Sequence, residues 1–201
     1  PIGLGHVTRD IAIARNLHEF SINFITGSGA AKMLQKLDFK IDDVYNPPSF
    51  IVNEGILKNQ TKWLWNYFHY YKNCKNISEK ILETNRTDLV ISDEDFASLT
   101  VAQNLKIPNI LITDVLETKF TKGIASLIER KMNKSMMNIV KNCDVVIIPE
   151  KGDDYDNIKK VGPIVREINI SREELRKKFS WDKITIVISI GGTSAGLFLI
   201  D

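Results

Sequence analysis

The sequence predicts an α/β protein with a Rossmann-like, doubly wound parallel sheet, in which helices cover both faces. Two observations lead to this prediction. Short apolar runs alternate with segments of helical periodicity, and a glycine-rich turn stands directly before the first helical segment. Continuous apolar runs are typical of strands buried on both faces, and an alternation of strand and helix places such strands in one parallel sheet.

Four apolar runs that end in turn or polar residues are predicted as strands. They are residues 22–27, 88–93, 109–114 and 144–149. The segments with helical periodicity are residues 8–19, 29–37, 58–84, 95–105 and 122–141. In the first of them Val7, Ile11, Ala14 and Leu17 recur at helical spacing, and Thr8 is the predicted N-cap. Ligands of such folds collect at the carboxyl ends of the strands.

Both ends of the chain point to further structure. A glycine turn of this kind should follow a strand, so we expect that a first strand is missing before Pro1. Near the other end, an apolar strand predicted at 184–190 leads into a second glycine turn, "GGTSAG". We therefore predict a first domain over residues 1–163, followed at 164–201 by a linker and the truncated start of a second Rossmann-like domain.

Composition excludes several classes of protein. The 201 residues are 43% hydrophobic and 26% charged, as in a globular protein, and a net charge of +2 gives no argument for a nucleic-acid partner. The first residues lack the charged and apolar regions typical of a signal peptide, and no apolar run approaches the roughly 20 residues that span a bilayer. We expect a cytoplasmic protein that can also lie at the inner face of the membrane. Cys74 and Cys143 are expected to be reduced, and no metal or cofactor is expected.

The opening "PIGLGHVTRD" carries the first candidate site. Gly3 and Gly5 let backbone N–H groups approach a phosphate before a helix, and His6 can titrate near neutral pH as a general base. In the alternative interpretation, His6 has only a structural role and hydrogen-bonds the backbone at the start of the helix. A dinucleotide fingerprint is a poor match, because Thr8 replaces its third glycine and no carboxylate ends the strand at 22–27.

Four motifs in order resemble GT-B-fold glycosyltransferases of the MurG type. "GLGHVTRDIAIARNL" resembles their first loop and helix, and "DLVISDEDFASLTVAQNLKIPNILI" resembles their strand, acidic turn, helix and next strand. "VGPIVRE" resembles the segment between their domains, and "SIGGTSAG" resembles the loop that opens their second domain. The resemblance covers almost the whole chain.

This resemblance implies a metal-independent, inverting hexosyltransferase. It would move a sugar from a nucleotide-diphosphate donor, expected to be a UDP-sugar, to the hydroxyl of a sugar or of a lipid-linked acceptor. His6 matches the family's histidine and would be the base. Arg166 matches the arginine between the domains and would bind the leaving diphosphate; a solvated surface arginine is the alternative. The second glycine turn would complete that anion site through Gly191, Gly192, Thr193 and Ser194.

Two carboxylates are predicted to join His6 because they follow strands. Asp93 and Asp114 end neighbouring strands, so both should face the same edge of the sheet, where either could orient His6 or bind sugar hydroxyls. In the alternative interpretation, the acidic residues 93–95 cap the helix that follows them.

Two segments are candidates for peripheral membrane contact. In "WLWNYFHYY", the predicted core stripe leaves Trp63 and Tyr70 free to face an acceptor or a membrane. The stripe is Leu64, Phe68, Tyr71, Cys74 and Ile77. The helix at 122–141 combines lysine and arginine with apolar residues and could attract anionic lipids, although a plain surface helix has the same pattern.

Two other functions remain open at this point. A nucleotide-sugar hydrolase of the same fold would use water in place of the acceptor, and a non-catalytic regulator would bind the nucleotide sugar without turning it over.

Overall fold

The computed structural model describes residues 4–49, 51–53, 56–119 and 121–186. The helices in these ranges are α1 (Leu4–Ala14), α2 (Ser28–Gln35), α3 (Gln60–Thr84), α4 (Phe96–Asn104), α5 (Ala125–Lys141) and α6 (Arg172–Lys178). The strands are β1 (Phe24–Thr26), β2 (Ile41–Asp43), β3 (Val52–Asn53), β4 (Ile56–Leu57), β5 (Val90–Asp93), β6 (Asn109–Ile112), β7 (Val145–Ile148) and β8 (Ile158–Lys160).

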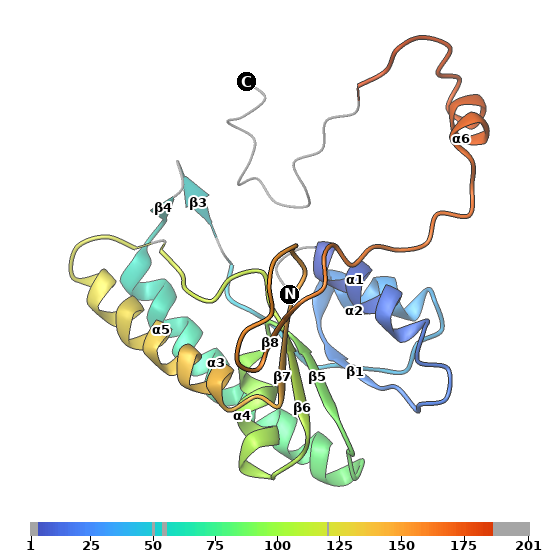
Figure 1. Ribbon diagram of the computed structural model, residues 1–201. Coiled ribbons are helices and arrows are strands. Elements are labelled where there is room, and N and C mark those ends of the chain that lie inside the picture. The colour runs from blue at the N-terminus through green and yellow to red at the C-terminus, as the bar shows by residue number, and fades with distance from the viewer. Residues whose placement is uncertain (1–3, 50, 54–55, 120, 187–201) are drawn as a thin grey trace.

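Parallel strands alternate with helices, as predicted from the sequence. β5, β6, β7 and β8 form a four-stranded sheet in that order, and all of its pairs are parallel (Figure 1). β1 and β2 form a second parallel pair, whereas β3 and β4 form a short antiparallel one. The α/β fold class is therefore confirmed. β2 and β8 were missed because "IDD" and "IKK" contain too few apolar residues to give a strand signal.

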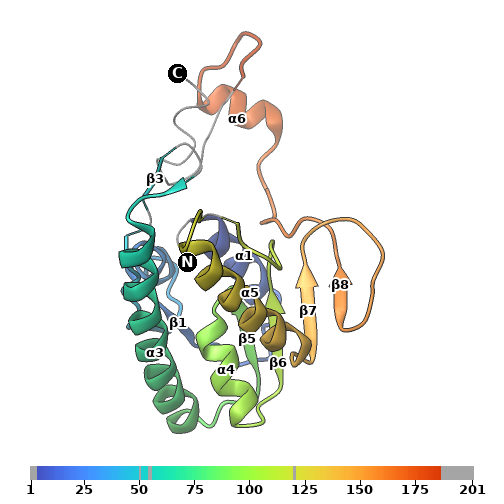
Figure 2. The same ribbon diagram turned by 90° about the vertical axis from the view of Figure 1, so that its left-hand side faces the viewer.

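One face of the four-stranded sheet is covered by α3, α4 and α5, which lie together in front of it in Figure 2. Leu111 and Val146 are fully buried against Leu99 of α4 and Val140 of α5. Val90 packs with Leu82 of α3 and Ala102 of α4. This apolar layer fixes where the strands end, and hence where the side chains that follow them stand.

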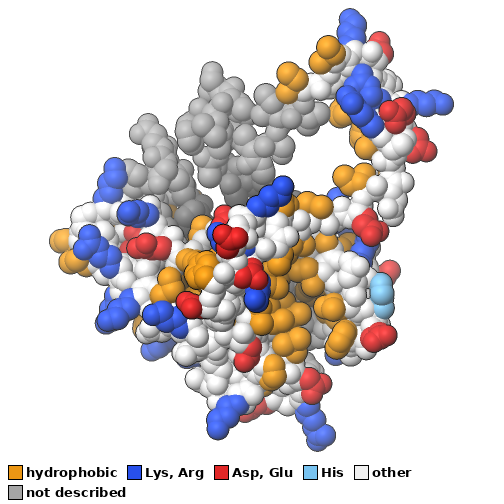
Figure 3. Space-filling view, viewed as in Figure 1, with side chains coloured by type: hydrophobic (Ala, Val, Ile, Leu, Met, Phe, Trp, Pro, Cys, Tyr) orange, Lys and Arg blue, Asp and Glu red, His pale blue; other side chains and the backbone are white. Residues whose placement is uncertain are grey.

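The other face of this sheet differs from the prediction that its strands are buried on both faces. Ile91, which alternates with the buried Val90 and Ser92, is 40% exposed. Ile110, Val145 and Ile147 alternate in the same way and are half-buried. Figure 3 shows apolar side chains gathered over the middle of the molecule on this side. An apolar run does not reveal how many of its faces are covered, which explains the difference.

α1 and α2 pack on the first strand pair, on the opposite side of the strands from α3 to α5 (Figure 1). The buried side of α1 is formed by Val7, Ile11 and Ala14, at the spacing that predicted the helix. The boundaries were wrong by several residues, because α1 begins at Leu4 and ends at Ala14. Thr8 therefore lies inside the helix and is not its N-cap.

The segment after β8 leads away from the sheets and contains α6 (Figure 1). Ser171 and Glu174 form a capping box at the start of α6. Of the strand predicted at 184–190, only residues 184–186 lie in the described ranges; they are not in a strand, and Ile184 is 98% exposed. The proposed division at residues 163 and 164 stays a prediction.

The aromatic segment of α3 was assigned partly to the wrong faces. Trp63 is buried and stacks on Tyr67, so it is not available to a membrane or an acceptor, and Tyr70 is half-buried. Phe68 was expected in the core but is 50% exposed, and Trp65 is 65% exposed. The buried face of α3 is therefore rotated relative to the predicted one, since it includes Trp63 as well as Leu64.

Candidate active site

α1 brings three ionisable side chains to the carboxyl edge of the sheet. His6, Arg9 and Asp10 stand three and four residues apart, which places them on the same face of a helix. Because Val7, Ile11 and Ala14 are buried on the neighbouring face, this arrangement holds the polar face of α1 against the end of β5.

The carboxylate of Asp93, the last residue of β5, contacts both His6 and Arg9. His6 Nδ1 lies 3.0 Å from Asp93 Oδ1. Arg9 donates from Nη2 to Oδ1 at 2.5 Å and from Nε to Oδ2 at 3.0 Å, which is a bidentate pair. The Asp93 side chain is only 5% exposed, so the pair is shielded from water.

The contact with Asp93 orients the imidazole. A nitrogen without hydrogen would bring its lone pair against the carboxylate oxygen 3.0 Å away, so Nδ1 carries the proton of the neutral ring and donates it to Asp93. Nε2 is then the acceptor. The hydrogen bond with Asp93 raises the pKa of His6, against the effect of burial. Burial alone would raise the pKa of Asp93, but the hydrogen bonds from His6 and Arg9 outweigh it and lower that pKa.

Asp10 adds a partly protonated carboxyl to this cluster. Burial, and then the charge of Asp93, raise the pKa of Asp10 to about 7. Asp10 also forms a side-chain hydrogen bond with Asp93, so the two carboxyl groups titrate as a pair. Asp93 holds the charge because His6 and Arg9 bind it directly.

Glu94 and Asp114 complete the edge. Glu94 has a left-handed backbone, with φ +60°, and its Oε1 accepts from the hydroxyl of Thr113 and the backbone N–H of Asp114. Its Oε2 lies 3.7 Å from His6 Nε2. Asp114 accepts from Arg9 Nη1 at 2.8 Å and is 52% exposed. The structure therefore brings His6, Asp93 and Asp114 together, although 87 residues separate the first two.

Helix capping, the alternative for the three acidic residues after β5, holds for Asp95 alone. Asp95 accepts from the backbone N–H groups of Ala97 and Ser98 at the start of α4, and the hydroxyl of Tyr45 donates to its other oxygen. Asp93 and Glu94 are engaged with the His6 cluster instead.

The remaining predicted site residues are not part of this cluster. Gly5 lies in the first turn of α1 rather than in a turn before it, and a Cβ there would meet no atom within 4 Å. This open space does not test the predicted approach of a phosphate to Gly5, which stays a prediction. Arg166 is exposed between β8 and α6, with no described contact to the cluster. The others lie outside the described residues: Gly3, Gly191, Gly192, Thr193 and Ser194.

Sequence reasoning missed Arg9 and Asp10. The available signal was their spacing, because positions three and four residues after a helical histidine share its face. Among the described residues, no group of three His, Cys, Asp or Glu side chains could hold a metal ion. In the same part of the chain, no helix is both long and apolar enough to cross a bilayer.

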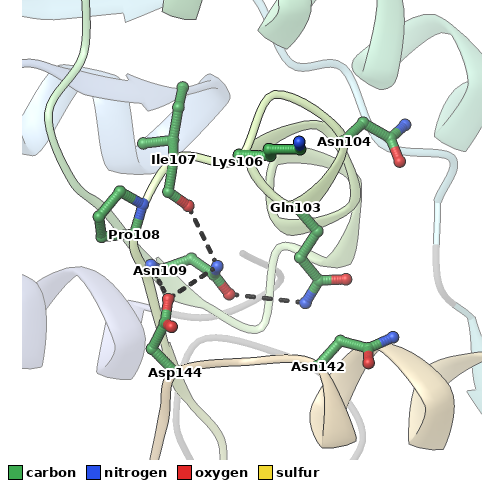
Figure 4. Close-up of a pocket in the computed structure, with 8 residues that line it drawn as sticks. All are labelled: Gln103, Asn104, Lys106, Ile107, Pro108, Asn109, Asn142 and Asp144. Carbon is green, nitrogen blue, oxygen red and sulfur yellow. Dashed lines mark hydrogen bonds between the residues drawn. The ribbon is translucent and has the colours of Figure 1, made fainter.

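A hollow of about 560 Å³ lies at the opposite, amino edge of the sheet (Figure 4). Part of its polar lining is engaged with neighbouring groups: Asp144 accepts from the backbone and side-chain nitrogens of Asn109, and Gln103 donates to the backbone oxygen of Ile139. It contains none of the residues around His6. The carboxyl edge is therefore the candidate active site.

No protein-family model matches the chain. An uncharacterized glycosyltransferase from Methanopyrus kandleri is 27% identical over 129 residues, which cover 58% of this chain and 36% of that protein. The chain is similar to a glycosyltransferase. It spans about a third of this relative's length.

Solved structures give more distant matches. MurG from Acinetobacter baumannii matches with a TM-score of 0.49 and 11% identity, over 82% of this chain and 43% of MurG. CalG4, the calicheamicin glycosyltransferase, has a TM-score of 0.48 and 16% identity, over 80% of this chain and 48% of CalG4. A candidate UDP-N-acetylglucosamine 2-epimerase from Listeria monocytogenes has a TM-score of 0.45 and 13% identity, over 74% of this chain and 35% of the epimerase. A fold does not specify a reaction, so the function is argued from the site.

Proposed function

We propose that the chain forms the acceptor side of a GT-B glycosyltransferase, a metal-independent and inverting hexosyltransferase that uses a UDP-sugar. The observation that carries this proposal is the pair of half-buried His6 and buried Asp93 at the carboxyl edge, with Nε2 of the ring left to accept a proton. The name of the curated relative supports a glycosyltransferase, and the finer parts of the proposal come from the resemblance of the four sequence motifs.

In the proposed step, the acceptor hydroxyl gives its proton to His6 Nε2 while its oxygen attacks the anomeric carbon of the donor. The bond from that carbon to the diphosphate breaks, and UDP leaves with the electron pair. Asp93 stabilises the imidazolium through Nδ1–H without taking its proton. Glu94 and Asp114 present carboxylate oxygens beside the ring and can accept hydrogen bonds from sugar hydroxyls.

The donor side of the proposal rests on the sequence. Arg166 would stabilise the leaving diphosphate, together with backbone N–H groups of the turn at Gly191 and Gly192 and the hydroxyls of Thr193 and Ser194. Arg166 is exposed and therefore open to a ligand. A metal ion would not be needed in this arrangement.

We extend the proposal to a lipid-linked acceptor and peripheral membrane contact. Ile124, Leu127 and Ile128, at the start of α5, are 81%, 62% and 48% exposed. Arg130 and Lys131 follow them on the same helix and are exposed. Flotation with vesicles tests the contact: binding to phosphatidylglycerol vesicles that survives Leu127→Ser would contradict it.

The reaction is tested in the full-length protein by product analysis with UDP-sugars and by two matched variants. His6→Ala should lower kcat about 100-fold, the usual scale for losing a general base, with donor affinity nearly unchanged. His18→Ala, which removes an exposed histidine, should leave kcat unchanged.

Three outcomes would change the proposal. Free sugar formed at full rate without an acceptor would indicate a hydrolase. Donor binding with no turnover that depends on His6 would indicate a regulator. If His6→Ala weakens donor binding and leaves kcat intact, His6 positions a ligand and is not the base.

A further inference from the structure

Arg9 occupies a central place that the proposed reaction does not explain. Its guanidinium donates three hydrogen bonds, two to Asp93 and one to Asp114, and its side chain is only 10% exposed. Its Nη2 also lies 3.1 Å from His6 Nδ1. The two nitrogens thus meet at the same oxygen, Oδ1 of Asp93.

Sharing this oxygen has an electrostatic consequence for the ring. When His6 takes up a proton, a second positive charge forms beside a guanidinium that is always charged. The negative charge of Asp93 is already divided between the two partners. We propose that Arg9 is a positioning residue for His6: it anchors Asp93 so that the carboxylate orients the ring, while its own charge keeps the ring from being held as a cation.

The groups that face His6 show why a positive charge is needed beside the ring. Asp93 and Glu94 stand at the two ring nitrogens, and Asp10 of α1 interacts with Asp93. The carboxylates of Asp93 and Glu94 both favour a protonated ring, which could not accept a proton from a hydroxyl. Arg9 is the cation within this group, and it also holds Asp114 of the neighbouring strand end. The catalytic consequence rests on the proposed function, but the effect of Arg9 on the ring does not.

The test is a titration of His6 by NMR, which needs no substrate. The chain has three histidines, so the ring signals can be resolved, and the signal lost in His6→Gln assigns His6. In Arg9→Met, the midpoint of the His6 titration should rise by about one pH unit. In Arg9→Lys, which keeps the charge, the rise should be less than half as large. Arg15→Met removes an exposed arginine just after α1 and should leave the midpoint unchanged.

An unchanged or lower midpoint in folded Arg9→Met would overturn the inference. If Arg9→Met does not fold, two other measurements test the inference: the midpoint of the His6 titration in Arg9→Lys, and the tautomer of His6 in the wild type. Nitrogen-15 shifts should place the proton of the neutral ring on Nδ1; a proton on Nε2 would make Nδ1 an acceptor from Arg9 and would overturn the inference. A protein that shows the expected shifts but transfers no sugar would retain the role of Arg9 and refute only the proposed function.

Discussion

The two edges of the four-stranded sheet use the same residue type in different ways. At the amino edge, Asp144 accepts hydrogen bonds from the backbone and side-chain nitrogens of Asn109. At the carboxyl edge, Asp93 accepts from His6 and Arg9, both of which come from α1. The first aspartate therefore satisfies neutral amide groups at the start of a strand. The second collects ionisable groups from a distant part of the chain.

This difference separates structural from chemical roles more clearly than the hollows of the surface do. A described hollow lies at the amino edge, where Asp144 and Gln103 are already engaged with amide groups. The carboxyl edge has shifted pKa values at His6, Asp10 and Asp93, each traceable to a named neighbour or to burial. Shifted ionisable groups at strand ends are the stronger sign of a functional site.

The largest expected difference compares truncation of the two aspartates. Asp93→Ala leaves the buried guanidinium of Arg9 without its main partner and should lower the free energy of unfolding by about 3 kcal/mol. Asp144→Ala, the matched variant at the amino edge, should cost about 1 kcal/mol, because it removes hydrogen bonds to amides only. Urea unfolding at pH 7 measures both. Equal losses of unfolding free energy in the two variants would contradict the proposed difference between the two edges.

A smaller effect concerns the proton shared by Asp10 and Asp93. The pKa of Asp10 is raised by folding, so the folded state binds the extra proton, and Asp10 lowers stability as the pH rises from about 4 to about 7. Asp10→Asn removes this cost. It should therefore be more stable than the wild type by at least about 1 kcal/mol at pH 8 and nearly equal to it at pH 4.

The difference between variant and wild type isolates Asp10, since other groups titrate in both proteins. His6 also has a raised pKa, so its contribution is present at low pH and is lost as the pH rises. Asp153→Asn changes an exposed aspartate and should show no such dependence on pH. A variant that tracks the wild type from pH 4 to pH 8 would contradict the shared proton.

The smallest effect tests whether the carboxyl edge depends on a glycine. Gly5 stands in a helical turn with open space around it, so Gly5→Ala should raise the free energy of unfolding by about 0.5 kcal/mol. Gly29→Ala, in the first turn of α2, has the same open surroundings and should give a similar gain. Thermal unfolding measures both. A loss of stability in Gly5→Ala but not in Gly29→Ala would support the predicted tight turn at position 5.

Local sequence patterns were sufficient for most elements of the fold. The four apolar runs correspond to β1, β5, β6 and β7, and each predicted helix overlaps an observed one. Their side chains repeat with the period of the element, so neighbours in sequence carry the information. The ends were less accurate: α1 starts four residues before the predicted boundary, because the stripe of Val7 and Ile11 fixes the face of a helix but not its first residue.

The sequence by itself determined the α/β class and the position of His6 at the start of a helix, since both follow from the order and spacing of nearby residues. It also placed Asp93 and Asp114 at the ends of parallel strands, because parallel strands end at the same edge of a sheet. The tertiary structure decided which of the acidic residues 93–95 meets His6 and that Arg9 joins it. These contacts depend on how α1 packs against β5, across more than 80 residues of chain, and no local pattern encodes that packing.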